Sequence, residues 1–216
     1  MIPHSFHRLW LGGGEPEWTR PFADTWREHH PDWELHQWGE GEVADLFPLR
    51  NQDIFDRAEE IAGERAGQLR SDVLRYEILD RFGGVWIDAD FECLRSIDGL
   101  LEGVECFAAW VTPEWVNNAI MGSVLGHPFV GRLIDGLAES VAGGGRPNVI
   151  SGPQFLTRVR AEHPDGVTLL DSKHFYPFDW REIEEYVPGG VDVARRWPEA
   201  YAVHWWRNRR HERGLA

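Results

Sequence analysis

Two aspartates, Asp88 and Asp90, follow a short apolar run at residues 85–87 and are well suited to hold a metal ion. Side chains two positions apart in an extended segment leave on the same side, so both carboxylates can meet one hard cation. The run is preceded by Gly83 and Gly84, a typical end for a helix. In open α/β sheets, ligands bind beyond the carboxyl ends of strands, where this pair is expected to lie. The pattern predicts a divalent cation that holds a diphosphate.

A helix expected over residues 64–82 carries polar residues within its apolar face. With about 100° of rotation per residue, the apolar arc consists of Leu69, Val73, Leu74, Tyr76, Ile78, Leu79 and Phe82. The opposite, polar side consists of Arg70, Glu77, Asp80 and Arg81. Ser71, Asp72 and Arg75 fall inside the apolar arc, where an uncompensated charge is costly. Asp72 and Arg75 are three residues apart and can pair. Two interpretations stay open: a structural ion pair, or contacts to a ligand.

The rest of the chain alternates between strand and helix patterns. Strands are expected over residues 3–10, 33–38, 105–111, 117–121, 167–170 and 201–205, and helices over residues 16–30, 42–62, 128–142 and 154–161. Such alternation is typical of a mainly parallel sheet with helices on both faces. At 216 residues, we expect a single α/β domain spanning residues 1–216.

Composition narrows the range of partners. The formal net charge of −14 argues against nucleic acid, because phosphate backbones require clustered Lys and Arg. A local exception is the basic run at residues 207–210, which could face a diphosphate or form a solvated tail. No apolar run is long enough to span a bilayer and the chain opens without a leader pattern, so we expect no transmembrane segment and a cytoplasmic location.

The cysteines and tryptophans have different implications. Cys93 and Cys106 are the only cysteines and do not form a CxxC pair, so neither a disulfide scaffold nor a thiolate zinc site is expected. Of the twelve tryptophans, most are expected in the core or half-buried. Flat aromatic rings also stack on sugars and bases. Trp10, at the end of the first expected strand, is the candidate for such a contact.

Residues 67–90 resemble the DXD region of glycosyltransferase family 32, on the Ser-Asp and Arg-Tyr pairs of the helix and the run Gly-Gly-Val-Trp-Ile-Asp-Ala-Asp. Further matches are present at residues 2–3, 7–12, 118–122, 126–129, 151–153 and 202–205, in the family's order, with His4 and Ser5 in place of the usual residues. The resemblance implies a GT-A fold, which is Rossmann-like. It also implies transfer of a sugar from a UDP- or GDP-sugar to a hydroxyl of a glycan, lipid or other acceptor, with retention of anomeric configuration.

The resemblance also implies roles for single residues. The metal ligands would be Asp90, Asp88 and His204, and the imidazole favours Mn²⁺ over Mg²⁺. The catalytic group would comprise Asp88, Asp90, Asp72, Arg75 and Asn118, with Asp72 orienting sugar hydroxyls. The donor contacts would come from Trp10, Leu9, Ser71, Arg75, Trp86, Asp88, Asn208 and Arg209, with Trp10 stacked on the base. The family commonly has Ser-Trp where Asn208 and Arg209 stand, so the contacts of that pair are in question.

Other classes remain as alternatives. Phosphatases of the haloacid dehalogenase type also carry Asp-x-Asp after an apolar strand, but near the N-terminus and followed by other residues than Phe91 and Glu92. A non-catalytic carbohydrate-binding protein or pseudoenzyme is compatible with the tryptophans alone. A lone histidine such as His204 is often structural.

Overall fold

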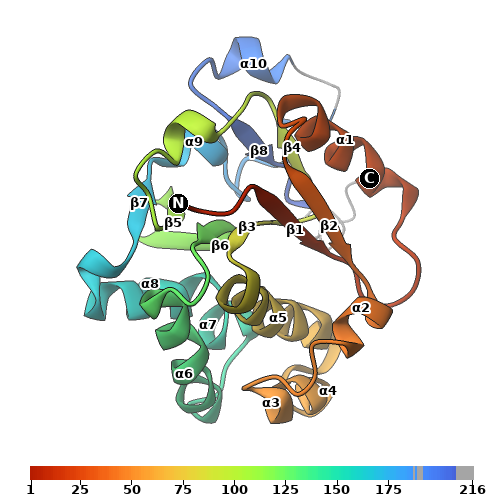
Figure 1. Cartoon of the computed structure of the whole chain (residues 1–216), viewed down its shortest axis with the longest axis vertical. Coiled ribbons are helices and arrows are strands. Elements are labelled where there is room, and N and C mark those ends of the chain that lie inside the picture. Colours follow the sequence, from red (N-terminus) through yellow and green to blue (C-terminus); the bar gives the residue numbers. More distant parts are fainter. Residues whose placement is uncertain (187, 189–191, 208–216) are drawn as a thin grey trace.

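The computed structural model describes residues 1–186, 188 and 192–207. A sheet crosses the middle of the molecule, with helices on both of its faces (Figure 1). Its order is β2-β1-β3-β6-β5-β7, and β4 and β8 form a second sheet of two strands. The strands are β1 Ser5–Leu9, β2 Glu34–Trp38, β3 Gly84–Ile87, β4 Phe91–Cys93, β5 Cys106–Thr112, β6 Trp115–Ser123, β7 Thr168–Leu170 and β8 Ala202–His204.

The central sheet is mainly parallel, as expected. β1 pairs in parallel with β2 and β3, and β5 with β7, whereas β6 runs antiparallel to both β3 and β5. β5 and β6 form an antiparallel hairpin. The strand expected at residues 117–121 is β6, which extends further at both ends, over Trp115–Ser123. The strand expected at residues 201–205 shortens to β8 and lies outside the main sheet, paired with β4, which was not predicted.

The expected helices are present except in one region, and three short helices are additional. The helices are α1 Arg20–His29, α2 Glu40–Ala44, α3 Gln52–Asp56, α4 Ala58–Ala62, α5 Ala66–Phe82, α6 Pro128–Ala142, α7 Pro147–Ile150, α8 Pro153–Glu162, α9 Ser172–Phe175 and α10 Val193–Arg196. The three that were not predicted are α7, α9 and α10. Short 3-10 turns lie at Glu17–Thr19, Gly63–Arg65, Asp98–Leu100 and Pro164–Gly166. The helical stretch expected at residues 42–62 is broken into three short helices. Pro48, which lacks an N–H to donate, lies in the break between α2 and α3.

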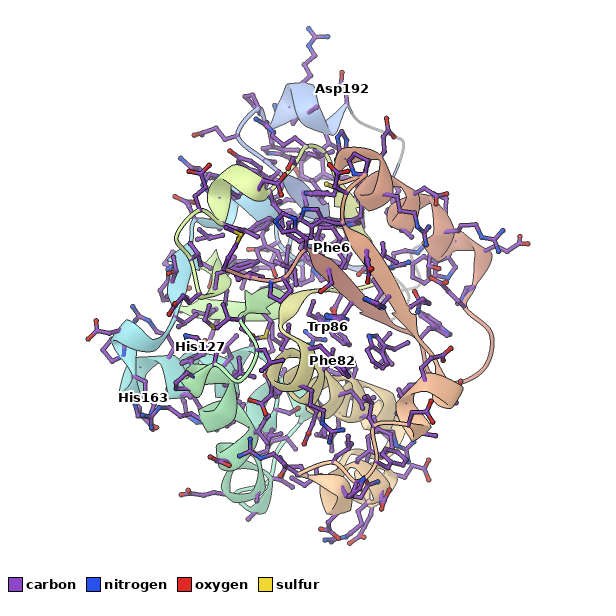
Figure 2. All side chains as sticks on the ribbon, in the orientation of Figure 1. Phe6, Phe82, Trp86, His127, His163 and Asp192 are labelled. Carbon is purple, nitrogen blue, oxygen red and sulfur yellow. The ribbon has the colours of Figure 1, made fainter. Side chains whose placement is uncertain are left out.

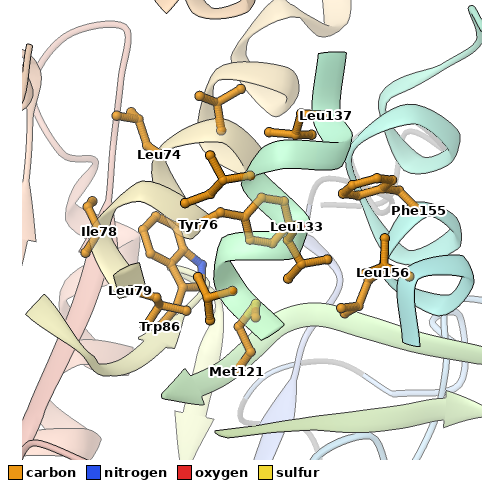
Figure 3. Packing of buried hydrophobic residues seen from close by; sticks show 14 of the residues in the cluster. Leu74, Tyr76, Ile78, Leu79, Trp86, Met121, Leu133, Leu137, Phe155 and Leu156 are labelled. Atoms are coloured by element: carbon orange, nitrogen blue, oxygen red, sulfur yellow. The ribbon is translucent and has the colours of Figure 1, made fainter. Parts of the chain in front are cut away.

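Two hydrophobic clusters lie on the two faces of the sheet. One contains α5, α6 and α8, with Trp86 of β3 directed into it beside Leu79 (Figure 3). The other joins β1 and α1 to β4, α9 and β8. Phe6 of β1 and Trp86 lie near the centre of the side-chain packing (Figure 2). All twelve tryptophans are buried or half-buried, and both cysteines are buried and free, as predicted.

The junction between α5 and β3 requires glycine. Gly83 and Gly84 have φ values of +65° and +86°. A Cβ on Gly84 would lie 2.4 Å from Oγ and 2.7 Å from the carbonyl oxygen of Ser5, which is in the neighbouring strand. Positive φ and close backbone approach together exclude other residues here. This junction fixes where β3 begins, and it therefore positions Asp88 and Asp90, which follow the strand.

The expected faces of α5 were wrong at two positions. Glu77, assigned to the polar side, is 1% exposed. It accepts a hydrogen bond from the backbone N of Arg50 (2.7 Å) and pairs with Arg81 (3.3 Å), so the loop before α3 covers this side of the helix and compensates the charge. Phe82, assigned to the apolar arc, is 43% exposed at the last position of the helix.

No helix among the described residues is both long and apolar enough to cross a membrane.

Candidate active site

A tight turn, rather than an extended segment, presents the two aspartates. The amide of Phe91 donates to the carbonyl of Asp88 (3.1 Å), which closes a turn through Ala89 and Asp90 between β3 and β4. The expectation that Asp88 and Asp90 converge through strand alternation is therefore corrected. The backbone N of Asp88 also donates to the carbonyl of Ala119 (2.9 Å) in β6, which fixes the turn against the sheet.

The turn brings Asp88 and Asp90 together with His204. One ligand atom from each of these residues lies within 4.8 Å of the other two. His204 arrives there because β8 pairs with β4 so that His204 stands opposite Phe91, with the two rings stacked at 4.9 Å. Asp90 and His204 are buried, whereas 30% of the Asp88 side chain is exposed. The group therefore opens to solvent on the side of Asp88.

The ionisation of Asp90 suits a metal ligand. Burial opposes its charge, but His204 and the hydrogen bonds outweigh burial and hold the pKa of Asp90 below its ordinary value. Oδ1 contacts Nε2 of His204 (3.0 Å), and Oδ2 accepts from the backbone N of Arg207 (2.7 Å). Nδ1 of His204 is buried without a partner among the described residues. Two carboxylates and an imidazole with an unsatisfied nitrogen fit a divalent cation that takes mixed O and N ligands.

Asp88 is also tied to α5. Its Oδ1 accepts from Nη2 of Arg75 (2.9 Å) and from Nε1 of Trp86 (2.9 Å). The guanidinium of Arg75 lies 4.9 Å from the centre of the Trp86 ring and donates to the carbonyl of Asn118. Ser71 is half-buried, with Oγ 3.4 Å from Nη2 of Arg75. Arg75, Trp86 and Ser71, which were predicted to contact the donor, thus lie around Asp88.

Asp72 sits deeper, in a network of neutral hydrogen-bond donors. It accepts from Oγ of Ser151 (2.7 Å) and Nδ2 of Asn118 (2.9 Å), while Nη2 of Arg75 is 3.7 Å away. Burial raises the pKa of Asp72 to about 6, and the charge of Arg75 and the two hydrogen bonds limit the rise. The interpretation as an ion pair holds in part, because Asp72 and Arg75 lie 3.7 Å apart but each has a closer partner. The alternative, contacts to a ligand, stays a prediction.

A register shift in the β5–β6 hairpin places Asn118. Ala108 pairs with Met121 and the next residue, Ala109, pairs with Asn117, so residues 118–120 are extra on β6. Such a bulge re-aims side chains. Here the bulge directs the side-chain amide of Asn118 toward Asp72, and no local sequence pattern indicated it.

Aromatic rings connect Trp10 with the Asp88–Phe91 turn, which we call the acidic turn. Trp10 is half-buried and meets Trp18 edge-on, with ring centres 5.7 Å apart. The guanidinium of Arg207 lies 4.4 Å from the Trp18 ring, while the backbone N of Arg207 binds Asp90. Leu9 is half-buried and packs against the cluster around α5. Asn208 and Arg209 lie outside the described residues.

Sequence reasoning missed two residues that shape the site. Ser151 was noted in a motif but not as a partner of Asp72. Arg8 of β1 is 1% exposed, donates to the carbonyls of Ala89 (3.1 Å) and Thr19 (3.2 Å), and pairs with Glu15 (3.2 Å). Arg8 thereby binds the backbone in the middle of the Asp88–Phe91 turn. A single arginine in a strand pattern carries no signal of such a contact.

Comparisons with known proteins agree with this geometry. A family model described as "Glycosyltransferase sugar-binding region containing DXD motif" matches residues 16–107. Mannosyl phosphorylinositol ceramide synthase CSH1 of Saccharomyces cerevisiae is 34% identical over 140 residues, which cover 63% of this chain and 35% of that protein. Inositol phosphoceramide mannosyltransferase 3 of Schizosaccharomyces pombe is 30% identical over 145 residues, covering 63% and 37%. The chain thus spans about a third of the length of these relatives.

Among solved structures, the PaToxG glycosyltransferase aligns with a TM-score of 0.59 at 16% identity, over 76% of this chain and 71% of that chain. At this identity the likeness shows the fold, and it confirms the expected GT-A architecture. The match over residues 16–107 includes α5, β3 and both aspartates. Over residues 16–107, the chain is thus similar to the glycosyltransferase sugar-binding regions that contain a DXD motif.

Proposed function

We propose that this protein is a metal-dependent glycosyltransferase that moves a sugar from a UDP- or GDP-sugar to a hydroxyl acceptor. The observation that carries the proposal is the convergence of Asp88, Asp90 and His204, whose ligand atoms lie within 4.8 Å of one another beside the buried Arg75 and Asp72. The match to glycosyltransferase sugar-binding regions supports the same conclusion.

The proposed cation is Mn²⁺, because an imidazole joins two carboxylates in the group. When bound, it supplies positive charge that stabilises the leaving diphosphate. The side chains around the cation would bind the nucleotide-sugar donor. Asp72 keeps unused acceptor positions beside its two hydrogen bonds, since a carboxylate offers about four, and these would orient sugar hydroxyls. Arg75 adds a positive charge next to Asp88.

We assign the nucleotide to the side of Trp10. Its ring is half-buried, and Trp18 and Arg207 connect it with Asp90. A base stacked on Trp10 would thus be followed by a diphosphate near Arg207 and the acidic turn.

The proposed acceptor is a hydroxyl of a lipid headgroup. The names of the two relatives described above contain phosphorylinositol ceramide and inositol phosphoceramide, which makes an inositol-containing sphingolipid the first acceptor to test. Glycans and other hydroxyl acceptors are the alternatives. We further propose that the anomeric configuration is retained, as the family resemblance implies.

The experiment is donor cleavage without acceptor, because water can replace the acceptor hydroxyl. The protein is incubated with Mn²⁺ and a panel of UDP- and GDP-sugars, and free nucleotide is measured. Asp90→Asn should lower release by at least ~100-fold, equivalent to about 2.7 kcal/mol of transition-state stabilisation. The exposed Asp98, in a 3-10 turn eight residues away, provides the control Asp98→Asn, which should act like the parent.

Two results would overturn the proposal. Equal nucleotide release by Asp90→Asn and the parent would exclude the DXD turn as the cation site. Binding of a nucleotide sugar by the parent, with no release and no transfer to any acceptor, would favour the pseudoenzyme alternative.

A further inference from the structure

Arg8 is a buried charge that the proposed reaction has not yet used. It lies in β1, which pairs with β3, the strand that leads into Asp88. A buried ionic group contributes little to stability on balance, since an apolar side chain of similar volume often serves the fold as well or better. The position of Arg8 in the core therefore indicates a task other than packing.

The guanidinium of Arg8 joins two separate segments. Its Nη2 donates to the carbonyl of Thr19 (3.2 Å) and to the carbonyl of Ala89 (3.1 Å), which stands between the two aspartates. Its Nη1 pairs with Oε1 of Glu15 (3.2 Å), which also accepts from Oγ1 of Thr19 (2.5 Å). Glu15 and Thr19 thus compensate the charge and fix the position of the guanidinium, while Nη2 binds the acidic turn.

The peptide that Arg8 binds is the one that can change its orientation in such a turn. The amide of Phe91 donates to the carbonyl of Asp88, so Ala89 and Asp90 are the two central residues. Turns of types I and II differ mainly in the orientation of the peptide between these residues, and type II requires positive φ at the second. Asp90 does not have positive φ, although aspartate adopts it more readily than most residues. The hydrogen bond from Arg8 favours the observed arrangement over the flipped one.

The orientation of this peptide also sets the direction of the Asp90 side chain. The nitrogen of the peptide belongs to Asp90, so a flip changes φ at Asp90 and turns its carboxylate. In the observed arrangement, Oδ1 contacts Nε2 of His204 (3.0 Å) and Oδ2 accepts from the backbone N of Arg207 (2.7 Å). Arg8 therefore acts on the carboxylate that joins His204 in the metal-binding group.

We propose that Arg8 is a positioning residue of the metal site, whose guanidinium fixes the central peptide of the acidic turn and thereby directs Asp88 and Asp90 toward one cation. The inference deepens the proposed function and rests on it. It assigns a task to a residue outside the family match, which begins at residue 16.

The test compares Arg8→Met and Arg8→Lys with the parent in Mn²⁺ binding, measured from the electron paramagnetic resonance of free Mn²⁺, with and without UDP. Methionine removes both the charge and the donors. Its Mn²⁺ affinity should fall ~10-fold, at the lower end for loss of an outer contact that orients a metal ligand. Lysine keeps the charge but has one nitrogen in place of the planar fork, so Arg8→Lys should lose less affinity.

The methionine variant separates positioning from charge. Removal of a positive charge close to two carboxylates would by itself strengthen the binding of a cation. A loss of Mn²⁺ affinity in Arg8→Met therefore reports the missing contacts to the turn. Near-ultraviolet circular dichroism without metal shows whether each variant keeps the fold of the parent.

Arg81→Met is the matched control. Arg81 likewise donates to two backbone carbonyls, those of Leu46 and Pro48, and pairs with a carboxylate, that of Glu77 (3.3 Å). These contacts hold the loop before α3 and not the acidic turn. Arg81→Met should bind Mn²⁺ like the parent, even where its melting temperature falls.

The outcomes separate the two proposals. If the parent itself binds no Mn²⁺ with or without UDP, the metal site fails and both proposals fall with it. If the parent binds Mn²⁺ and a folded Arg8→Met binds it equally well or more tightly, only the assignment of Arg8 is overturned. If only Arg8→Lys folds, parent-like affinity in that variant overturns the assignment. If neither variant folds, Arg8 is required for the fold itself, which also overturns it.

Discussion

Asp72 and Asp88 are held differently although both lie beside Arg75. Asp88 is partly exposed and bonded directly to the guanidinium, at 2.9 Å. Asp72 is buried and relies mainly on the neutral donors Ser151 and Asn118, so burial raises its pKa to about 6. One arginine therefore serves two carboxylates in different surroundings. The buried one, Asp72, is the one we assign to the sugar hydroxyls.

The raised pKa of Asp72 gives the first prediction at this scale. Because the native state binds this proton more tightly than the unfolded state, the contribution of Asp72 to the free energy of unfolding should decrease as pH rises from about 4 to 6, by on the order of 3 kcal/mol. Urea unfolding across that range should show this decrease as the difference between the parent and Asp72→Asn. The variant should also cleave the donor at least ~10-fold more slowly at pH 8, because it cannot be ionised. An unfolding profile in the variant with the same decrease as the parent would contradict the assignment.

At the scale of elements, β1 is held between its neighbours by a neutral histidine. Nε2 of His7 bonds to the carbonyl of Gly83 (3.0 Å), and Nδ1 accepts from Nε1 of Trp38 (3.2 Å) in β2. Only the neutral ring with its proton on Nε2 satisfies both contacts. Burial is the main cause that lowers the pKa of His7 to about 4. His7 thus links β2, β1 and the α5–β3 junction that positions the aspartates.

This histidine predicts an opposite dependence on pH. The unfolded chain takes up a proton at this side chain near pH 6.5 and the native state only near 4, so the contribution of His7 to the free energy of unfolding should fall as pH falls through this window, by about 3 kcal/mol. His7→Phe should show a flatter profile between pH 7 and 4 in urea unfolding. His163→Phe, at the periphery (Figure 2), is the control and should keep the parent's profile. Identical profiles for His7→Phe and the parent would exclude His7 as the cause.

At the scale of the whole molecule, the site joins distant parts of the chain. Asp90 and His204 are 114 residues apart in sequence and meet only because β4 pairs with β8. Together with Arg207 and Trp18, they connect the C-terminal part of the described chain to the first helical region. A ligand bound there stabilises this long-range contact.

Ligand binding should therefore raise thermal stability. With Mn²⁺ and UDP at about 100 times their dissociation constants, the gain of ~2.7 kcal/mol corresponds to a rise in Tm of roughly 5–10 °C for a chain of this size. Differential scanning fluorimetry measures the rise. His204→Ala should lose most of it, whereas His174→Ala, in α9, should retain it. Equal rises in His204→Ala and the parent would place the ligand elsewhere.

The sequence by itself determined the local elements and the chemistry of the site. The periodicity of apolar residues and the glycine pair between the two elements located α5 and β3. The Asp-x-Asp spacing, together with the polar residues Ser71, Asp72 and Arg75, indicated the cation and donor site. These features are local, because periodicity reports which face of an element is buried. The assigned roles, the cytoplasmic location and the domain extent of residues 1–216 stay predictions.

The tertiary structure decided which distant groups complete the site. The turn at Asp88–Phe91, the β4–β8 pair, the bulge that directs Asn118, and the contacts of Arg8 and Ser151 all depend on strand pairing or packing across many residues. Glu77 was misplaced for the same reason, since amides from a separate loop compensate its charge. Contacts between distant residues produce no periodic pattern in the sequence around either partner. Each partner is compatible with its own local helix or strand pattern whether or not the other is present.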